Sequence, residues 1–130
     1  MKVIRSRSLP SPCRIGDRET RTTSVGLVQT KWFESADAHT EQLTEGVCAC
    51  AEAGANVVFL PELTLSRYPA DTRPEGPADV SAEDLENGPS LALAKTLAQS
   101  CDVHLQISLF ERSGAVDQRG LNTSIIVSPN

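Results

Sequence analysis

The stretch NVVFLPE at residues 56–62 decides how this chain is interpreted. Residues 56–60 form a short apolar run, which is typical of a strand that is covered on both faces. Pro61 has no backbone N–H to donate to a neighbouring strand, so pairing should stop there and leave Glu62 at the carboxyl end of the strand. Open α/β sheets bind their ligands at that end, although a solvated loop glutamate is the ordinary alternative for Glu62.

Elements upstream of this strand complete a βαβ unit. Residues 24–29 form a second short apolar run, which predicts a strand. Residues 36–54 repeat small and apolar side chains at steps of three and four, which predicts an amphipathic helix with Ser35 as N-cap and Gly54 at its end. Strand, helix and strand in this order predict two parallel strands with a right-handed crossover.

Downstream, a proline-rich and acidic loop is expected over residues 66–87, and a second helix begins near Pro89. Strands are predicted at 103–110 and 121–127, joined by a turn at 113–120 as a hairpin. The predicted order is β-α-β-α-β-β, an α/β layered fold in which two helices cover only one face of a four-stranded sheet.

Charge is distributed unevenly along the 130 residues, whose net charge is -5. Residues 1–22 are basic, and we expect them to form a disordered extension, with an organelle presequence or a start assigned too far upstream as alternatives. Residues 23–130 form the expected domain, whose acidity argues against nucleic acid as a partner. No apolar run approaches the roughly 20 residues of a membrane span, so we expect a cytoplasmic protein without a membrane partner.

The four cysteines and two histidines do not suggest a metal site or another cofactor. Cys48 and Cys50 are two positions apart on the predicted helix, so their side chains point roughly 200° apart and cannot bind one zinc ion. We expect free thiols, because no secretory signal is present. His39 is expected to be solvated and His104 to be packed at a strand end.

The residues argue against two other classes of protein, a serine hydrolase and a flavodoxin-like ligand-binding domain. A serine hydrolase built from Asp102, His104 and Ser108 is disfavoured, because His104 and Ser108 would lie roughly 13 Å apart on one strand. A flavodoxin-like ligand-binding domain would need a phosphate-binding loop after the first strand, and residues 29–32 contain no glycine to form one.

Four segments together resemble the nitrilase superfamily of carbon–nitrogen hydrolases, in the order found there. GANVVFLPEL at residues 54–63 resembles the stretch that carries the first catalytic glutamate of that family. VGLVQ at 25–29 is similar to its opening strand, ISLFER at 107–112 to its third strand with a following glutamate–arginine pair, and LNTSIIV at 121–127 to its asparagine-bearing strand. The resemblance runs from about residue 23 to residue 130.

This resemblance implies the N-terminal half of a four-layer α-β-β-α sandwich and the hydrolysis of non-peptide C–N bonds. Glu62 would be the general base of a glutamate–lysine–cysteine triad. It would take the proton of a thiol whose pKa is normally near 8.5, while the lysine stabilises the oxyanion. The implied partner is a small amide, carbamoyl or nitrile substrate, and we expect a homo-oligomer.

The sequence also departs from the family pattern. Lys31 comes too early and Lys95 lies within a helix, and none of the four cysteines matches the nucleophile position. We therefore expect this chain to be inactive by itself, and a non-catalytic fragment or interaction subunit is the alternative function. Ser108 stands where the family commonly has glycine, with no catalytic role expected, and Tyr68 is a candidate substrate-binding residue at the start of a variable loop.

Overall fold

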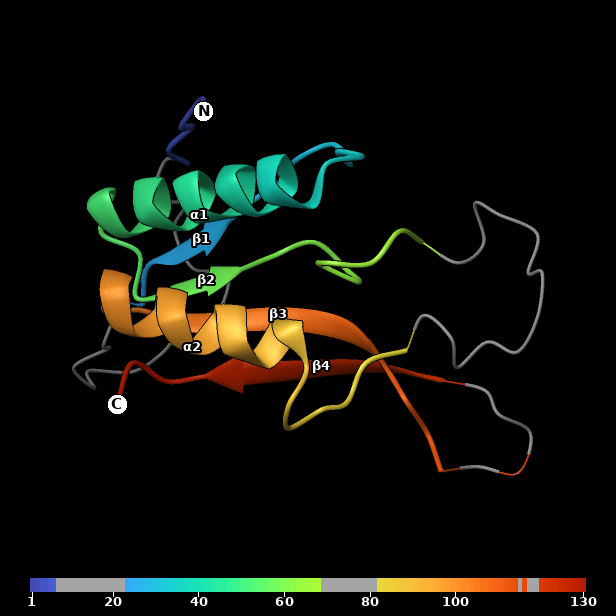
Figure 1. Cartoon of the computed structure of the whole chain (residues 1–130). Helices are drawn as coiled ribbons and strands as arrows, with labels where there is room; N and C mark the ends of the chain where they lie inside the picture. The colour runs from blue at the N-terminus through green and yellow to red at the C-terminus, as the bar shows by residue number, and fades with distance from the viewer. Residues whose placement is uncertain (7–22, 69–81, 115, 117–119) are drawn as a thin grey trace, which may run out of the picture.

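A computed structural model describes residues 1–6, 23–68, 82–114, 116 and 120–130 of the chain. The element order is β-α-β-α-β-β, as predicted (Figure 1). The elements are β1 (Val25–Leu27), α1 (Ala36–Glu52), β2 (Val57–Phe59), α2 (Pro89–Cys101), β3 (His104–Glu111) and β4 (Leu121–Val127).

The four strands form one mixed sheet in the order β1-β2-β3-β4. β1, β2 and β3 are parallel neighbours. After each of the first two strands, a helix brings the chain back to the end of the sheet at which that strand began, so the next strand runs in the same direction. β4 runs antiparallel to β3 in the predicted hairpin, with Ser108 opposite Ser124. β1 and β2 are shorter than the apolar runs predicted, since regular pairing covers three residues in each.

The helix ends follow the residues that the sequence indicated. Ser35 is the N-cap of α1, and its hydroxyl accepts a hydrogen bond from the Ala38 N–H at 3.3 Å. Gly54 follows the end of α1 with φ +89°, a conformation that favours glycine. Pro89 occupies the first turn of α2, where its missing N–H costs no helical hydrogen bond.

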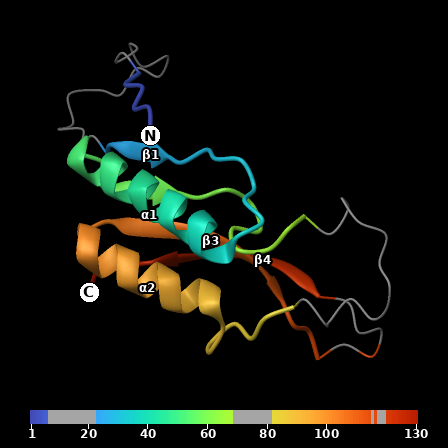
Figure 2. The same ribbon diagram turned by 45° about the horizontal axis from the view of Figure 1, so that its top comes forward.

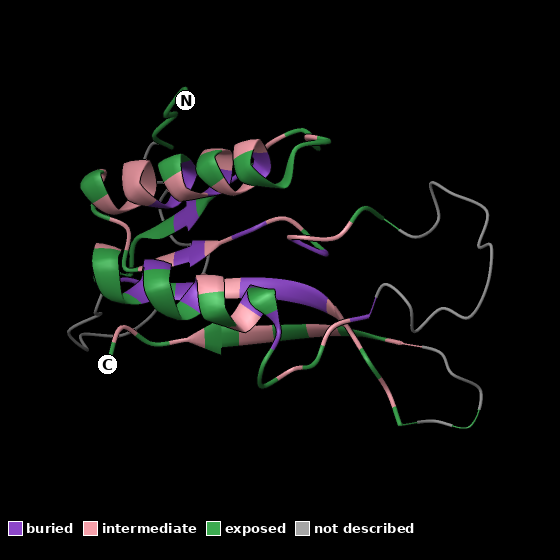
Figure 3. Ribbon diagram, viewed as in Figure 1, coloured by how far each residue is buried: buried purple, intermediate pink, exposed green. Residues whose placement is uncertain are grey.

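Both helices pack on the same face of the sheet (Figure 2). They enclose one core with the inward-facing strand residues, and buried positions concentrate in β3 and along the inner sides of the helices (Figure 3). Fully enclosed core residues are Leu43, Val47, Val58, Ala94, Ala98, Leu105 and Ile107. The opposite face has no helix over it, and Leu27 and Ile126 there are 76% and 61% exposed.

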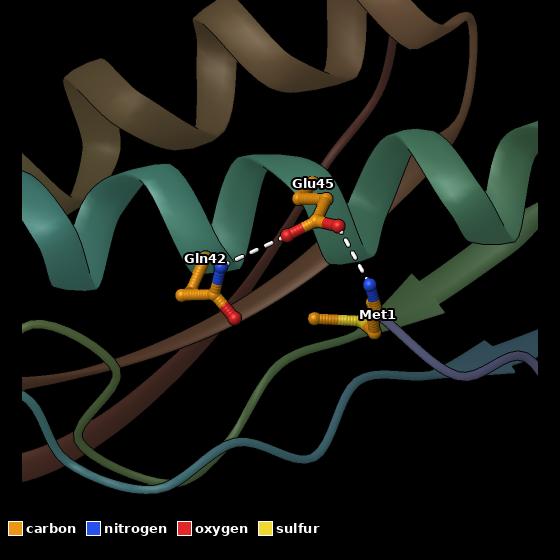
Figure 4. Close-up of polar contacts among 3 residues, drawn as sticks. All are labelled: Met1, Gln42 and Glu45. Atoms are coloured by element: carbon orange, nitrogen blue, oxygen red, sulfur yellow. Dashed lines mark hydrogen bonds and ion pairs between the residues drawn. The ribbon is translucent and has the colours of Figure 1, made fainter.

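The first residues of the chain contact the outer side of α1. The amino group of Met1 lies 2.6 Å from Glu45 Oε1, and Gln42 donates to the other carboxylate oxygen at 2.9 Å (Figure 4). This hydrogen bond from the amino group lowers the pKa of the Glu45 carboxyl. Residues 7–22, on which the predicted disordered extension depends, lie outside the described part of the chain.

Candidate functional site

Glu62 lies in the turn that follows β2, at the carboxyl end of the parallel strands. Strand-like pairing continues as far as Leu60, whose N–H donates to Gln106 O at 3.1 Å, and the chain then leaves the sheet at Pro61. Glu62 is exposed, whereas the next residue, Leu63, is buried and has φ +50°. The turn therefore buries Leu63 and presents the Glu62 carboxylate to solvent.

The Glu62 carboxylate is held by a side chain from the far strand of the sheet. Asn122, on β4, donates from Nδ2 to Glu62 Oε1 at 2.5 Å. Ser108, on β3, donates from its hydroxyl to Asn122 Oδ1 at 3.2 Å and accepts from the Leu63 N–H at 3.2 Å. Three segments that are distant in the sequence thus meet in one hydrogen-bonded group around Glu62.

Thr64 and His39 fix the other side of the turn. The Thr64 hydroxyl donates to Pro61 O at 2.8 Å, and the Thr64 carbonyl accepts from His39 Nε2 at 2.8 Å. His39 is only 5% exposed, and its ring lies 4.5 Å from that of Trp32. Among the described residues, its buried Nδ1 has no hydrogen-bond partner. The ring thus supports the turn through Nε2.

The predictions made from the sequence for the environments of His39 and His104 were wrong. His39 is buried rather than solvated, because the turn after β2 folds back over α1 and brings a carbonyl to its ring. His104 is exposed rather than packed, because it faces the side of the sheet that carries no helix. In the described part of the chain, no group of three or more His, Cys, Asp or Glu side chains is arranged to hold a metal ion.

A cleft of about 170 Å³ opens beside Glu62. It is lined by Thr30, Trp32, His39, Pro61, Glu62, Leu63, Thr64, Ser66, Arg67 and Tyr68. The structure thus places Tyr68 in the same cleft as Glu62, and it is 48% exposed there. The predicted loop continues through residues 69–81, which lie outside the described part of the chain.

This arrangement can bind a small polar molecule and take a proton from it. An exposed carboxylate next to a cleft, oriented by an amide donor, is suited to general-base catalysis once a proton donor comes within hydrogen-bond reach. Arg67 contributes a positive charge and Trp32 an aromatic ring to the same cleft. Of the two lysines considered earlier, Lys31 lies over the Phe33 ring and Lys95 is exposed on α2.

Sequence reasoning missed three members of this site. Ser108 entered only as a disfavoured serine nucleophile and as a departure from glycine, Asn122 only as part of a resemblance, and His39 was assigned to solvent. Alternation along β3 and β4 could have placed Ser108 and Asn122 on the same face, because the predicted hairpin puts them on neighbouring strands. No local signal connects His39 to Thr64, since that contact depends on how the turn folds over α1.

The chain matches the family described as Carbon-nitrogen hydrolase over residues 24–130. This match covers most of the sequence, and the chain belongs to that family. Its fold is the half-domain of a carbon-nitrogen hydrolase, with the mixed four-stranded sheet and two helices described above. No curated protein sequence matches the chain significantly.

Solved structures of the same class show the same fold. A carbon-nitrogen hydrolase from Helicobacter pylori G27 is similar with a TM-score of 0.67 and 22% identity, over 82% of this chain and 36% of that one. An N-terminal amidase gives 0.60 and 18%, over 81% and 25%. A CN-hydrolase superfamily protein from Xanthomonas campestris gives 0.58 and 21%, over 81% and 36%. The chain thus spans between a quarter and about a third of the length of these structures.

Proposed function

We propose that the protein to which this chain belongs hydrolyses a non-peptide C–N bond of a small molecule, with Glu62 as the general base. The substrate classes are amides, carbamoyl compounds and nitriles. The observation that carries this proposal is the position of Glu62, at the mouth of a cleft and oriented by the Asn122 amide. Membership of the carbon-nitrogen hydrolase family supports the reaction class.

The proposed reaction divides the work among three side chains. Glu62 takes a proton from a cysteine thiol, and the thiolate attacks the carbon of the C–N bond. A lysine stabilises the oxyanion, and as the C–N bond breaks the amine leaves with the proton that Glu62 had taken, which leaves a thioester. A water molecule that gives its proton to Glu62 then hydrolyses the thioester, releasing the acid, and the proton returns to the thiol. We propose that this lysine and cysteine are additional to residues 1–130, since neither Lys31, whose ammonium group lies over the Phe33 ring, nor Lys95, exposed on α2, lines the cleft beside Glu62. Tyr68 contributes a wall of the substrate cleft in this proposal.

Replacing Glu62 by glutamine tests the proposal. The full-length protein is first screened against amides, carbamoyl amines and nitriles, and Glu62→Gln is then measured on the substrate found. Glutamine keeps the size and hydrogen-bonding capacity of glutamate but takes no proton, so we expect kcat to fall by about 10²–10⁴, or about 3–5 kcal/mol. The melting temperature should be unchanged, because Glu62 is exposed.

A matched control is Glu41→Gln, which makes the same chemical change at an exposed position on α1. It should leave both kcat and stability within about 0.5 kcal/mol of the unmodified protein. Glu62→Gln activity within tenfold of the unmodified protein would return Glu62 to the role of a solvated loop residue.

The alternative from another class is a non-catalytic fragment or interaction subunit that keeps only this half of the fold. The helix-free face favours it, because Leu27 and Ile126 are exposed there and could contact a partner or a second copy of the chain. Reading the gene beyond the codon for Asn130 separates the two functions, since only the hydrolase needs a following lysine and cysteine. A cytoplasmic location and a homo-oligomeric state are part of the hydrolase proposal. Among the described residues, no helix is long and apolar enough to cross a membrane.

A further inference from the structure

The hydroxyl of Ser108 connects the turn that carries Glu62 with the strand that carries Asn122. Ser108 is 4% exposed. Its oxygen accepts from the Leu63 N–H at 3.2 Å, and its hydroxyl donates to Asn122 Oδ1 at 3.2 Å. A hydroxyl has one proton, so accepting from a backbone N–H on one side leaves that proton available for the amide oxygen on the other.

This direction of donation determines which end of the Asn122 amide faces Glu62. An ionised carboxylate only accepts hydrogen bonds, so a favourable contact requires the NH₂ end of the amide. Because the Ser108 hydroxyl donates to Oδ1, the NH₂ end is turned toward Glu62, where Nδ2 lies 2.5 Å from Oε1. The donors and acceptors therefore run in one consistent order from Leu63 through Ser108 and Asn122 to Glu62.

Ser108 also holds the backbone of the turn. Its N–H donates to Thr64 Oγ1 at 3.2 Å, and its carbonyl accepts from the Thr64 N–H at 2.8 Å. Leu63 has φ +50°, a left-handed conformation that is unfavourable for a residue with a side chain. A conformation of this kind persists when the surrounding structure fixes it, and the bond from the Leu63 N–H to Ser108 Oγ contributes to that.

We propose that Ser108 is a positioning residue for the general base: its hydroxyl orients Asn122 toward Glu62 and fixes the turn on which Glu62 stands. Ser108 itself does not line the cleft; it contacts Leu63 and Thr64, which do. The inference rests on the proposed function of Glu62 and adds to it a side chain that acts only through others.

Kinetics of Ser108→Ala in the full-length protein test the positioning role. We expect kcat to fall by about 10- to 100-fold, because a small displacement of a catalytic group has effects of this size. KM should change by less than about twofold, since Ser108 does not line the cleft. Ser108→Thr keeps the hydroxyl and should restore most of kcat, whereas full kcat in Ser108→Ala overturns the proposal.

The matched control is Ser124→Ala, at the position opposite Ser108 in the β3–β4 pairing. The Ser124 hydroxyl accepts from Gln106 Nε2 at 2.6 Å, so its removal deletes a hydroxyl from the same sheet without touching the Glu62 turn. It should leave kcat unchanged, and a loss equal to that of Ser108→Ala overturns the proposal. If Ser108→Ala does not fold, Ser108→Cys replaces it, because a thiol has nearly the same size but donates weakly. Unchanged kcat in Ser108→Cys then also overturns the proposal.

Hydrogen exchange provides a readout that does not depend on activity. In Ser108→Ala the Leu63 amide should exchange about tenfold faster or more, with recovery in Ser108→Thr, because its acceptor is removed and then restored. Ser108→Ala should also cost less kcat in an Asn122→Ala background than in the unmodified protein, since residues in one hydrogen-bond network are not additive and only the bond to the Leu63 N–H is then left to lose. The role of Ser108 is overturned if the Leu63 amide exchanges at an unchanged rate in Ser108→Ala, or if the kcat losses of Ser108→Ala and Asn122→Ala simply add. Either outcome counts even when Glu62→Gln has lost turnover. Retained turnover in Glu62→Gln instead overturns the proposed function.

Discussion

Glu62 and Asn122 lie 60 positions apart in the chain, yet their side chains are in direct contact. Each hydrogen bond of this group contributes only about 0.5–1.5 kcal/mol net to folding. Their combined effect is geometric, because they hold the carboxylate against the Asn122 amide where Glu62 lines the cleft. At the scale of single residues, the hydrogen bonds around Glu62 therefore matter more for where they hold its carboxylate than for the free energy they add to folding.

Gly26 shows how one small residue sets the distance between β1 and α1. A Cβ at this position would lie 2.7 Å from Cys50 Cβ and 2.8 Å from Cys50 Sγ, closer than such atoms approach in proteins. We expect Gly26→Ala to lower the free energy of unfolding by about 1–3 kcal/mol, because the strand and the helix must move apart. Chemical denaturation of the full-length protein measures the loss.

Gly114→Ala is the matched control for this substitution. A Cβ at Gly114 meets no atom of the described residues within 4 Å, so the same chemical change should alter stability by under about 0.5 kcal/mol. Equal effects of the two substitutions would contradict the close approach of β1 and α1.

At the scale of elements, α1 and α2 lie side by side on the sheet and bring two thiols together. Cys48 Sγ on α1 is 3.2 Å from Cys101 Sγ on α2. The hydrogen bond with Cys101 raises the pKa of the Cys48 thiol above its ordinary value, and partial burial raises it further. Cys48, Cys50 and Cys101 are free thiols in the structure.

We expect Cys48 and Cys101 to form a disulfide on treatment with oxidised glutathione, which tests the packing of α1 against α2. The two thiols lose two hydrogens as one S–S bond forms, and the oxidant is reduced to two molecules of glutathione. Because the pKa of Cys48 is raised, the reaction should be slow at neutral pH and accelerate as the pH rises. Peptide mapping by mass spectrometry identifies the bond.

Two serine substitutions serve as controls for this reaction. Cys50→Ser should leave the bond intact, because Cys50 is two positions from Cys48 and faces β1 near Gly26. Cys48→Ser should abolish it. A bond between Cys48 and Cys50 in the unmodified protein would contradict the helix packing.

At the scale of the whole molecule, the sheet has one covered and one uncovered face. Apolar side chains on the uncovered face include Val25, Leu27 and Ile126, which are 55%, 76% and 61% exposed. Exposed apolar patches and unpaired strand edges promote association. The uncovered face is therefore the surface of the described structure on which packing of another layer would bury these exposed apolar side chains.

We expect the 130-residue chain by itself to form oligomers or aggregates at micromolar concentration, as measured by light scattering. Placing lysine at Leu27 and Ile126 should reduce this association, because two charges then lie within the apolar patch. Gln99→Lys adds a charge at an exposed position on α2, away from that face, and should have no such effect. A monomer with a cooperative melting transition would show instead that this half of the fold is stable without a further layer.

The sequence by itself determined the class of fold and the position of Glu62. The periods of three and four residues in α1 and α2 and the short apolar runs of the strands are local patterns, and the physics that produces them acts between near neighbours. Pro61 ends the pairing of β2 for the same local reason. The order β-α-β-α-β-β, the β3–β4 hairpin, the cap at Ser35 and the start of α2 at Pro89 followed from such signals.

The tertiary structure alone decided which side chains meet at Glu62. Contacts of Asn122, Ser108 and His39 with the turn join positions between 25 and 60 residues apart. No local pattern encodes such contacts, because they depend on the register of β3 against β4 and on how the turn folds over α1. The burial of His39 and the exposure of His104 were misjudged for that reason: the first depends on the turn that folds over α1, and the second on the absence of a helix over that face of the sheet among the described residues.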